Sequence, residues 1–330
     1  VARAENANMP YAMVLLQAPT LNANLLLNAG TSLTLLRSGG TSGAGGVFSN
    51  ESIDPATGNI YFNAQGCSGQ PGVSGDLWAF NEASGDQTRV STQVSCGQAP
   101  PEVRAPSAQL PDPGYLRPQP PAASWSGLTV SSGTEYLCPG TYATQITVNA
   151  GATAVLLPGV FRILSEGIQV SGTLRTLNAG ETVVTTNGCA LPTPNPPTGD
   201  LGAIVEIVPA DDGTYNCNKN VFRTNGAGSA VTLTPSPRYG NISLYVEQIP
   251  NWQTICTQAV HGTNVIRLTG GGTYSITGAI YAPADNVQLA GSTGSAVGQV
   301  IAWTAAITGT GNVTATFNPA SAPFLKGLVQ

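Results

Sequence analysis

The chain has 330 residues, of which charged residues make up only 9%, and its formal net charge at pH 7 is −5. Disordered segments combine low hydrophobicity with high charge, and this composition has neither. The 12 Lys and Arg residues form no basic run, which argues against binding to a nucleic-acid backbone or electrostatic docking on anionic lipid. The 40 glycines and 25 prolines indicate an ordered all-β chain with many turns.

Residues 1–20 predict a short helical segment. Met9, Met13 and Leu16 recur at a spacing of three to four residues before Pro19. We interpret this segment as the exposed end of something longer that has been removed.

Residues 21–99 predict a looser β region. Leu25 and Leu27, and then Leu33 and Leu35, alternate with other residues, as in half-buried strands. Eight prolines follow between residues 100 and 121, and such a run favours an extended conformation that cannot complete a sheet. Residues 100–124 are thus expected to form a strap across the surface or a linker.

Residues 125–317 repeat about every 21 residues, which predicts a right-handed parallel β-helix. A β-sandwich is the alternative, but its strands do not superpose at fixed intervals. The matched pairs near the start are Ile146 with Ile168 and Val148 with Val170. In the stretch 264–317 the matched sets are Ile266, Val287 and Ile307; Leu268 and Leu289; Ile280 and Ile301; and Gly270, Gly291 and Gly311.

Residues 187–262 are expected to form an insertion in this β-helix that disulfides pin, and residues 318–330 a tail without periodicity. Six widely spaced cysteines and no CxxC pair favour disulfides in an oxidising compartment over a zinc site. Of the 15 possible pairings, we expect the one that joins Cys67 to Cys96, Cys189 to Cys217, and Cys138 to Cys256.

The search for a catalytic or metal site is negative. The single histidine, His261, has no nucleophile motif near it in the sequence and is interpreted as a polar turn residue. Asp211 and Asp212 form the one adjacent acidic pair, in a stretch that reads as a hairpin tip, and they are weak candidates for a calcium site. The glycines at 38–46 do not match a phosphate-binding loop. We therefore expect neither an enzyme nor a cofactor.

Binding residues are sought among the sparse aromatic side chains. Trp252 and Tyr215 lie in the expected insertion and are the candidates for an interaction surface, whereas Trp303 is better explained by core packing. Three Asn-X-Ser/Thr sequons mark possible glycosylation sites at Asn50, Asn241 and Asn312.

Two stretches resemble a known family. PGTYATQITVNAGATAVLLPGVFRI and TGAIYAPADNVQLAGSTGSAVGQVIAWTAAITGTGNVTATF are similar to patterns in the TadG-like proteins of tight-adherence (Tad) pilus systems. LPDPGYLRP resembles the proline-rich strap that joins the two halves in that group. The likeness covers residues 115–317 well and implies export and a place at the cell surface, but it carries over no active-site residue. It also implies an N-terminal membrane or pilin-like helix, of which the start of this chain would be the remnant, so membrane attachment is expected only through that absent helix.

These observations predict an extracellular, non-enzymatic structural or adhesive protein that is a pilus-associated or surface filament component. Its expected partners are other surface or pilus subunits, including a second copy stacked end to end. Two alternatives remain open. One is a glycan-binding or glycan-degrading β-helix protein, and the other is a self-stacking filament or surface-layer subunit.

Overall fold

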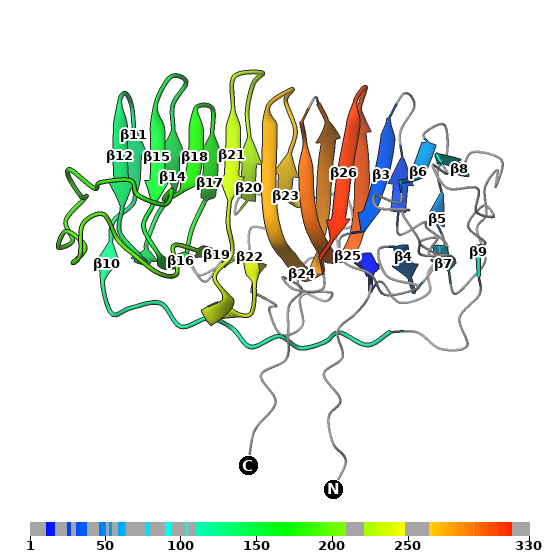
Figure 1. The fold of residues 1–330 in the computed structure, drawn as a ribbon, viewed down its shortest axis with the longest axis horizontal. Helices are drawn as coiled ribbons and strands as arrows, with labels where there is room; N and C mark the ends of the chain where they lie inside the picture. Colours follow the sequence, from blue (N-terminus) through cyan, green and yellow to red (C-terminus); the bar gives the residue numbers. More distant parts are fainter. Residues whose placement is uncertain are drawn as a thin grey trace, which may run out of the picture.

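The protein is an elongated β-solenoid in which every described strand pair is parallel (Figure 1). The computed structural model describes residues 11–16, 25–27, 31–37, 46–50, 53–54, 59–63, 77–79, 90–93, 103–104, 110–208, 221–247, 264–292 and 294–318. The parallel pairing confirms the predicted β-helix and rules out the sandwich, whose strands are antiparallel. The one described helical element is the 3-10 turn η2 (Pro237–Tyr239).

Each coil of the solenoid contributes one strand to each of three ladders. The first ladder runs through β10 (Ser124–Trp125), β13 (Gly140–Tyr142), β16 (Gly159–Ile163), β19 (Ala203–Ile207), β22 (Ile242–Val246), β24 (Thr273–Gly291), β25 (Ala296–Gly309), β1 (Tyr11–Leu15), β4 (Gly46–Ser49), β7 (Leu77–Ala79) and β9 (Val103–Arg104).

The second and third ladders follow the same order, with β24 and β25 long enough to enter all three. The second contains β11 (Leu128–Val130), β14 (Ile146–Val148), β17 (Gly167–Val170), β20 (Val221–Thr224), β23 (Asn264–Leu268), β24, β25, β2 (Leu25–Leu27) and β5 (Ile53–Asp54). The third contains β12 (Thr134–Leu137), β15 (Thr153–Leu156), β18 (Thr173–Thr176), β21 (Ala230–Leu233), β24, β25, β26 (Asn312–Phe317), β3 (Ser32–Arg37), β6 (Asn59–Asn63) and β8 (Val90–Gln93).

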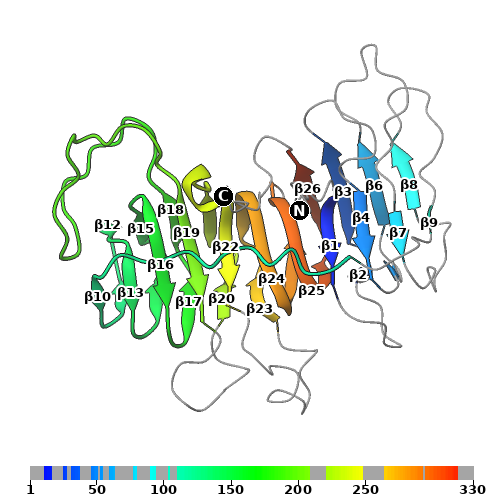
Figure 2. The same cartoon turned by 90° about the horizontal axis from the view of Figure 1, so that it is seen from below.

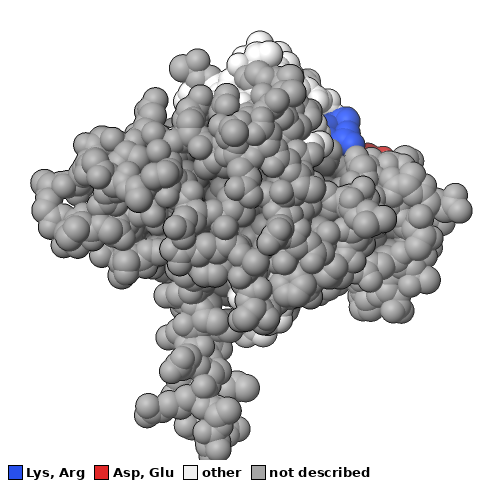
Figure 3. All heavy atoms as spheres, turned by 90° about the vertical axis from the view of Figure 1, so that its right-hand side faces the viewer, with Lys and Arg blue, Asp and Glu red and all other residues white. Residues whose placement is uncertain are grey.

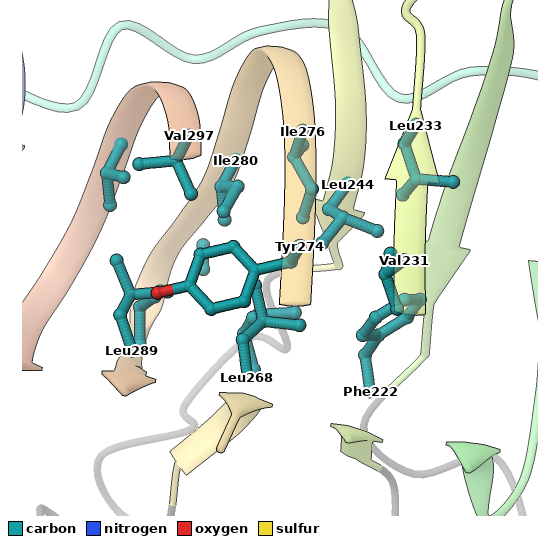
Figure 4. Packing of buried hydrophobic residues seen from close by; sticks show 14 of the residues in the cluster. Phe222, Val231, Leu233, Leu244, Leu268, Tyr274, Ile276, Ile280, Leu289 and Val297 are labelled. Atoms are coloured by element: carbon teal, nitrogen blue, oxygen red, sulfur yellow. The ribbon is translucent and has the colours of Figure 1, made fainter. Parts of the chain in front are cut away.

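Inward-facing side chains of the three ladders form one continuous apolar core. Figure 4 shows the ring of Tyr274 lying across this interior between Leu268 and Leu289. The Tyr274 hydroxyl donates to the carbonyl oxygen of Ala290 at 3.1 Å, which gives this buried polar group a partner. Matching inward residues stack from coil to coil, so the core is built by repetition.

The predicted offsets are correct where the coil length is regular. Ile146 lies opposite Ile168, and Ile266 lies opposite Val287. Between β24 and β25 the register shifts, so that Ala282 pairs with Ala302 but Asn286 pairs with Thr304. Another shift, between Ile276 and Ala279, precedes it, and together the two shorten the coil. Three predicted matches are therefore wrong: Ile301 lies opposite Tyr281 rather than Ile280, Ile307 lies opposite Leu289 rather than Val287, and Gly291 pairs with Gly309 rather than Gly311.

The spatial order of the coils differs from their order in the chain. Strands β1 and β2 pair with β25, and β3 pairs with β26, so the coils of residues 11–104 stack on the last coil of the C-terminal part. The 21–99 region thus extends the same three ladders (Figures 1 and 2). The chain then returns along the outside to the far end, where β10 begins the winding again (Figure 2).

The predicted N-terminal helix is wrong for the part that is described. Tyr11–Leu15 is the strand β1, and Ala12, Met13, Val14 and Leu15 are all fully buried. Both faces of β1 are covered, the inner one by the core and the outer one by the returning chain, so its sequence lacks the alternation of a half-buried strand. An apolar run of this kind resembles a helix segment by periodicity alone.

The predicted insertion at 187–262 is interrupted by regular strands, because β19, β20, β21 and β22 continue the ladders. Residues 177–202 form a separate excursion that folds back over the first coil. Within it, the Asn187 backbone N–H donates to the carbonyl oxygen of Tyr136 at 3.1 Å, on the outer edge of β12.

The excursion is tied to the first coil by a disulfide between Cys138 and Cys189. This bond corrects the predicted pairing of Cys189 with Cys217 and of Cys138 with Cys256. The prediction favoured cysteines close in sequence, whereas the fold brings the end of β12 next to the excursion. Cys67, Cys96, Cys217 and Cys256 lie outside the described residues.

Charge is scarce on the described surface. Figure 3 looks onto the end formed by the N-terminal strands, and the described atoms visible there are almost all uncharged. A basic and an acidic side chain lie side by side at one place in this view. Glu206, one of the two buried charged residues in the described part of the chain, lies instead beneath the returning chain.

Candidate functional site

The outer face of the first ladder is covered by the returning chain, residues 110–123, which we call the strap (Figure 2). Outward-facing positions of a solenoid strand normally carry polar side chains, but this face carries Val14, Tyr245, Tyr281 and Ile301 in register. All four are buried. The strap therefore gives the first ladder a second, external apolar core.

Aromatic contacts form the centre of this external core. Tyr115 of the strap meets Tyr281 edge to face, with ring centroids 5.1 Å apart, and Tyr281 contacts Tyr245 at 5.2 Å. Ring pairs of this geometry stabilise a contact by about 0.5–1.5 kcal/mol beyond the area that they bury. Burial raises the pKa of Tyr115 and of Tyr245 to about 12, so both stay neutral and apolar at physiological pH.

Two polar contacts fix the strap where it leaves the N-terminal coils. The Leu110 backbone N–H donates to Oδ1 of Asn50, and Nδ2 of Asn50 donates to the Leu110 carbonyl oxygen, both at 2.8 Å. The Tyr281 hydroxyl donates to Oδ1 of Asp112 at 2.6 Å. Asn50 belongs to the N-terminal coils and Tyr281 to the C-terminal part, so the strap is anchored on both.

A cluster of four charged side chains holds the middle of the strap. Nε of Arg117 donates to Oε1 of Glu206 at 2.5 Å, and Nη1 of Arg117 donates to Oε1 of Glu247 at 3.0 Å. Nη2 of Arg162 donates to Oε2 of Glu247 at 3.1 Å. Arg162 and Glu206 are direct cross-strand neighbours in β16 and β19. Two positive and two negative charges are thus brought together, and Arg117 is the one that the strap supplies.

Glu206 is the most constrained member of this cluster, because its side chain is fully buried. Its Oε2 has no hydrogen-bond partner, since Nε of Arg162 lies 3.8 Å away. Desolvation, aided by the nearby charge of Glu247 and opposed by Arg117, raises the pKa of Glu206 to about 7. Its charge therefore changes near neutral pH.

A second ion pair orders the excursion. Arg175 donates to both carboxylate oxygens of Glu181, at 2.6 and 2.7 Å, in a bidentate arrangement. The Tyr136 hydroxyl also donates to Glu181, at 3.0 Å. These hydrogen bonds, that from Arg175 foremost, lower the pKa of Glu181 to about 2. The pair closes the excursion over apolar residues of the third ladder, among them Val155 and Leu157.

The sequence candidates for binding and catalysis are not brought together in the described part of the chain. Asp211, Asp212, Tyr215, Trp252 and His261 all lie outside the described residues. No group of His, Cys, Asp or Glu side chains that could hold a metal occurs in the ranges that the structure describes. The interaction surface expected at Trp252 and Tyr215 stays a prediction.

The sequon asparagines are structural in two of three cases. Asn50 is 4% exposed and anchors the strap, and Asn241 is 6% exposed, so neither amide is open to a glycan in this fold. Asn312 is half-buried on the third ladder, where its Oδ1 accepts hydrogen bonds from the hydroxyls of Ser32 and Thr34. Trp303 is half-buried and belongs to none of the described core clusters, so the expected core packing is not found.

The strap contacts were missed in the sequence, although signals for them exist. Glu206 stands in the apolar strand AIVEI, and a charge in such a strand needs a partner. Asp112 and Arg117 are the two charged residues of the strap, and both are engaged. Nothing local indicates that they pair with residues 89 and 169 positions away.

Comparison with known proteins yields no relative. No family model matches the chain, and neither curated proteins nor solved structures give a match. Among the described residues, no helix is long and apolar enough to cross a lipid bilayer. The site is therefore interpreted from its geometry alone: a strap that covers the outer face of the first ladder and joins the N-terminal coils to the C-terminal part.

Proposed function

We propose that this chain is an exported, non-enzymatic structural protein of the cell surface, and that it serves as a pilus-associated or filament component. The observation that carries the proposal is the strap, whose apolar, hydrogen-bonded and ionic contacts bind the N-terminal coils to the C-terminal part. An elongated body locked in this way suits mechanical support and display. The four charged side chains at the middle of the strap hold it in place, because each of them takes part in an ion pair within the cluster.

The disulfide supports export. Cys138 and Cys189 form a disulfide that closes the excursion over the end of the solenoid, and such bonds persist in oxidising compartments. The similarity of two sequence stretches to Tad-type pilus proteins points in the same direction. The elongated shape and the low charge content of 9% support a role as a spacer or a tip component.

Localisation in cells that produce the protein tests the proposal. Immunogold electron microscopy should place the intact chain on surface fibres or on the outer envelope, and the protein recovered there should contain the oxidised Cys138–Cys189 pair. Deletion of the gene should weaken attachment of the cells to surfaces, and the wild-type gene should restore it. A cytoplasmic protein with reduced thiols would contradict the proposal.

A further inference from the structure

The solenoid contains one seam, where coils that are far apart in the sequence stack on each other. On one side lie β25 and β26, and on the other lie β1, β2 and β3. Every described coil of residues 124–317 is joined directly by the chain to its neighbours. Within the described residues, the two sides of the seam are joined covalently only through the strap, so the solenoid can separate there without breaking any described coil.

The contacts across the seam are of the same kinds as those between other neighbouring coils, namely apolar side chains and backbone hydrogen bonds. Met13, Leu25 and Leu27 face Val300, Ala305 and Ile307. The Leu16 backbone N–H donates to the Ala302 carbonyl oxygen at 2.8 Å, and that of Ser32 donates to Gly311 at 3.1 Å. Nε2 of Gln299 donates to the carbonyl oxygen of Tyr11 at 2.7 Å. If separated, each side would expose an apolar strand edge that needs a partner of the same shape.

The strap crosses the seam over a very short stretch. Leu110 is bound to Asn50 on the N-terminal side, and Asp112 is bound to Tyr281 on the other. Directly after Asp112 comes Pro113-Gly114, where Gly114 has a φ of +62° and no atom lies within 4 Å of the place where a Cβ would be. The chain that joins the two sides thus runs from Leu110 to Gly114, and its Pro111, Asp112 and Gly114 are exposed, which suits this stretch to act as a hinge.

We propose that the seam is an assembly interface, in which the N-terminal coils (residues 11–104) of one copy dock on the β25–β26 edge of a second copy. The exchanged junction would reproduce the contacts of the closed monomer, so it requires no new surface. The two edges differ, which makes the contact heterologous, and copies linked in succession form a chain of solenoids. This inference deepens the filament role proposed above by naming the partner as the same chain.

The closed form remains favoured in dilute solution. The strap holds the N-terminal coils beside their own edge at a high effective concentration, so exchange between copies requires opening and grows with protein concentration. The cluster of Arg117, Arg162, Glu206 and Glu247 lies on the C-terminal part and keeps the rest of the strap in place. Opening at Asp112–Gly114 therefore leaves that cluster intact.

A pair of single-cysteine variants tests the exchange. Thr34 and Thr314 are direct partners across the seam, and both are half-buried on the outward side of the third ladder. Full-length T34C and T314C are unfolded, mixed, refolded together at low and at high protein concentration, and treated with a short bismaleimide. Exchange places the two new thiols in the same junction, so a cross-linked species of twice the chain mass should form. Mapping should identify residues 34 and 314 in the bridge.

The controls separate exchange from collision. T232C replaces T314C in the matched control, because Thr232 is exposed on the same ladder but four strand steps from Thr34. The wild type gives the background from native thiols, and the double variant T34C/T314C reports closure within one chain. A dimeric 34–314 bridge at least fivefold above the T232C control, rising with concentration, supports the proposal.

The opposite result is equally clear. A double variant that cross-links within one chain, together with a T34C and T314C mixture that stays at the level of the T232C control at both concentrations, overturns the exchange. That result would leave the surface location open, because the location is tested by microscopy on cells. Conversely, if microscopy found no protein at the cell surface, a positive cross-linking result would still support exchange between copies.

Discussion

The side-chain amide of Asn50 pairs with the main chain of Leu110 through two hydrogen bonds, as a neighbouring strand would. Its Oδ1 accepts from the Leu110 N–H, and its Nδ2 donates to the Leu110 carbonyl oxygen. The same amide nitrogen also donates to the carbonyl oxygen of Leu16, at 3.2 Å. One buried side chain thus fixes both the strap and the end of β1. This contact joins the N-terminal coils to the returning chain.

Replacing Asn50 by alanine should lower the free energy of unfolding by about 1–3 kcal/mol, because buried groups of the main chain lose their partners. Urea unfolding at neutral pH measures the change. N149A is the matched control, since Asn149 is an exposed turn residue, and it should stay within about 0.5 kcal/mol of the wild type. Equal effects of the two substitutions would show that the Asn50 contact is not needed.

Glu206 should make the stability depend on pH in the neutral range. Its pKa is raised to about 7 in the folded protein from 4.5, so above pH 4.5 the unfolded chain loses this proton before the folded chain does. Stability is therefore lost as the pH rises from about 4.5 through about 7, by about 3 kcal/mol in total. E206Q keeps the shape without the charge, and its stability should fall less over this range.

Unfolding of wild type and E206Q at several pH values between 5 and 8.5 tests this prediction. The stability difference between the two proteins should shift in favour of E206Q as the pH rises. E135Q serves as a control, because Glu135 lies on the first coil, away from the strap. A difference that is constant with pH would mean that Glu206 is ionised throughout.

The Cys138–Cys189 disulfide should stabilise the fold appreciably. It closes a loop with a sequence separation of 51, for which chain entropy alone gives at most about 4 kcal/mol. The double substitution C138S/C189S should therefore cost about 2–4 kcal/mol in thermal or urea unfolding. Peptide mapping without reduction should recover residues 138 and 189 in one cross-linked peptide, and a peptide linking 189 to 217 would contradict the fold.

Gly298 should tolerate no side chain. A Cβ there would lie 2.0 Å from the carbonyl oxygen of Gly278 on the neighbouring coil, so G298A should cost about 1–3 kcal/mol. G228A is the matched control, because nothing lies within 4 Å of a Cβ at that position. It should be neutral or slightly stabilising. Circular dichroism melting curves of both variants give the comparison.

The fold could be predicted from the sequence wherever inward positions repeat. Ile146 and Ile168 match because both must fill the same place in successive coils. Ile301 was misplaced because the strap makes the outward positions of the first ladder apolar as well, which removes the alternation that distinguishes the two faces. The register shifts between β24 and β25 also displaced the predicted pairs along the strands. No local feature of the sequence indicates where a coil is shorter than its neighbours.

The candidate site was less accessible to sequence reasoning. The proline-rich composition predicted a strap, and the structure places residues 110–123 along the outside of the first ladder. The partners of Arg117 and Asp112 depend on the spatial order of the coils, and that order is set by the pairing of β1–β3 with β25 and β26. Contacts between strands almost 300 residues apart produce no periodic pattern in the sequence.

The strap also limits the length of the solenoid. From the level of β4 to that of β10 the first ladder makes eight strand-to-strand steps, and at about 4.8 Å each they span roughly 38 Å. Residues 110–124, at about 3.1 Å per residue in an extended form, reach roughly 43 Å. Open repeat proteins gain or lose units freely. Here the reach exceeds the span by about one strand step, so beyond one added coil every further coil needs one or two more strap residues, and the length of the strap sets an upper limit to the number of coils.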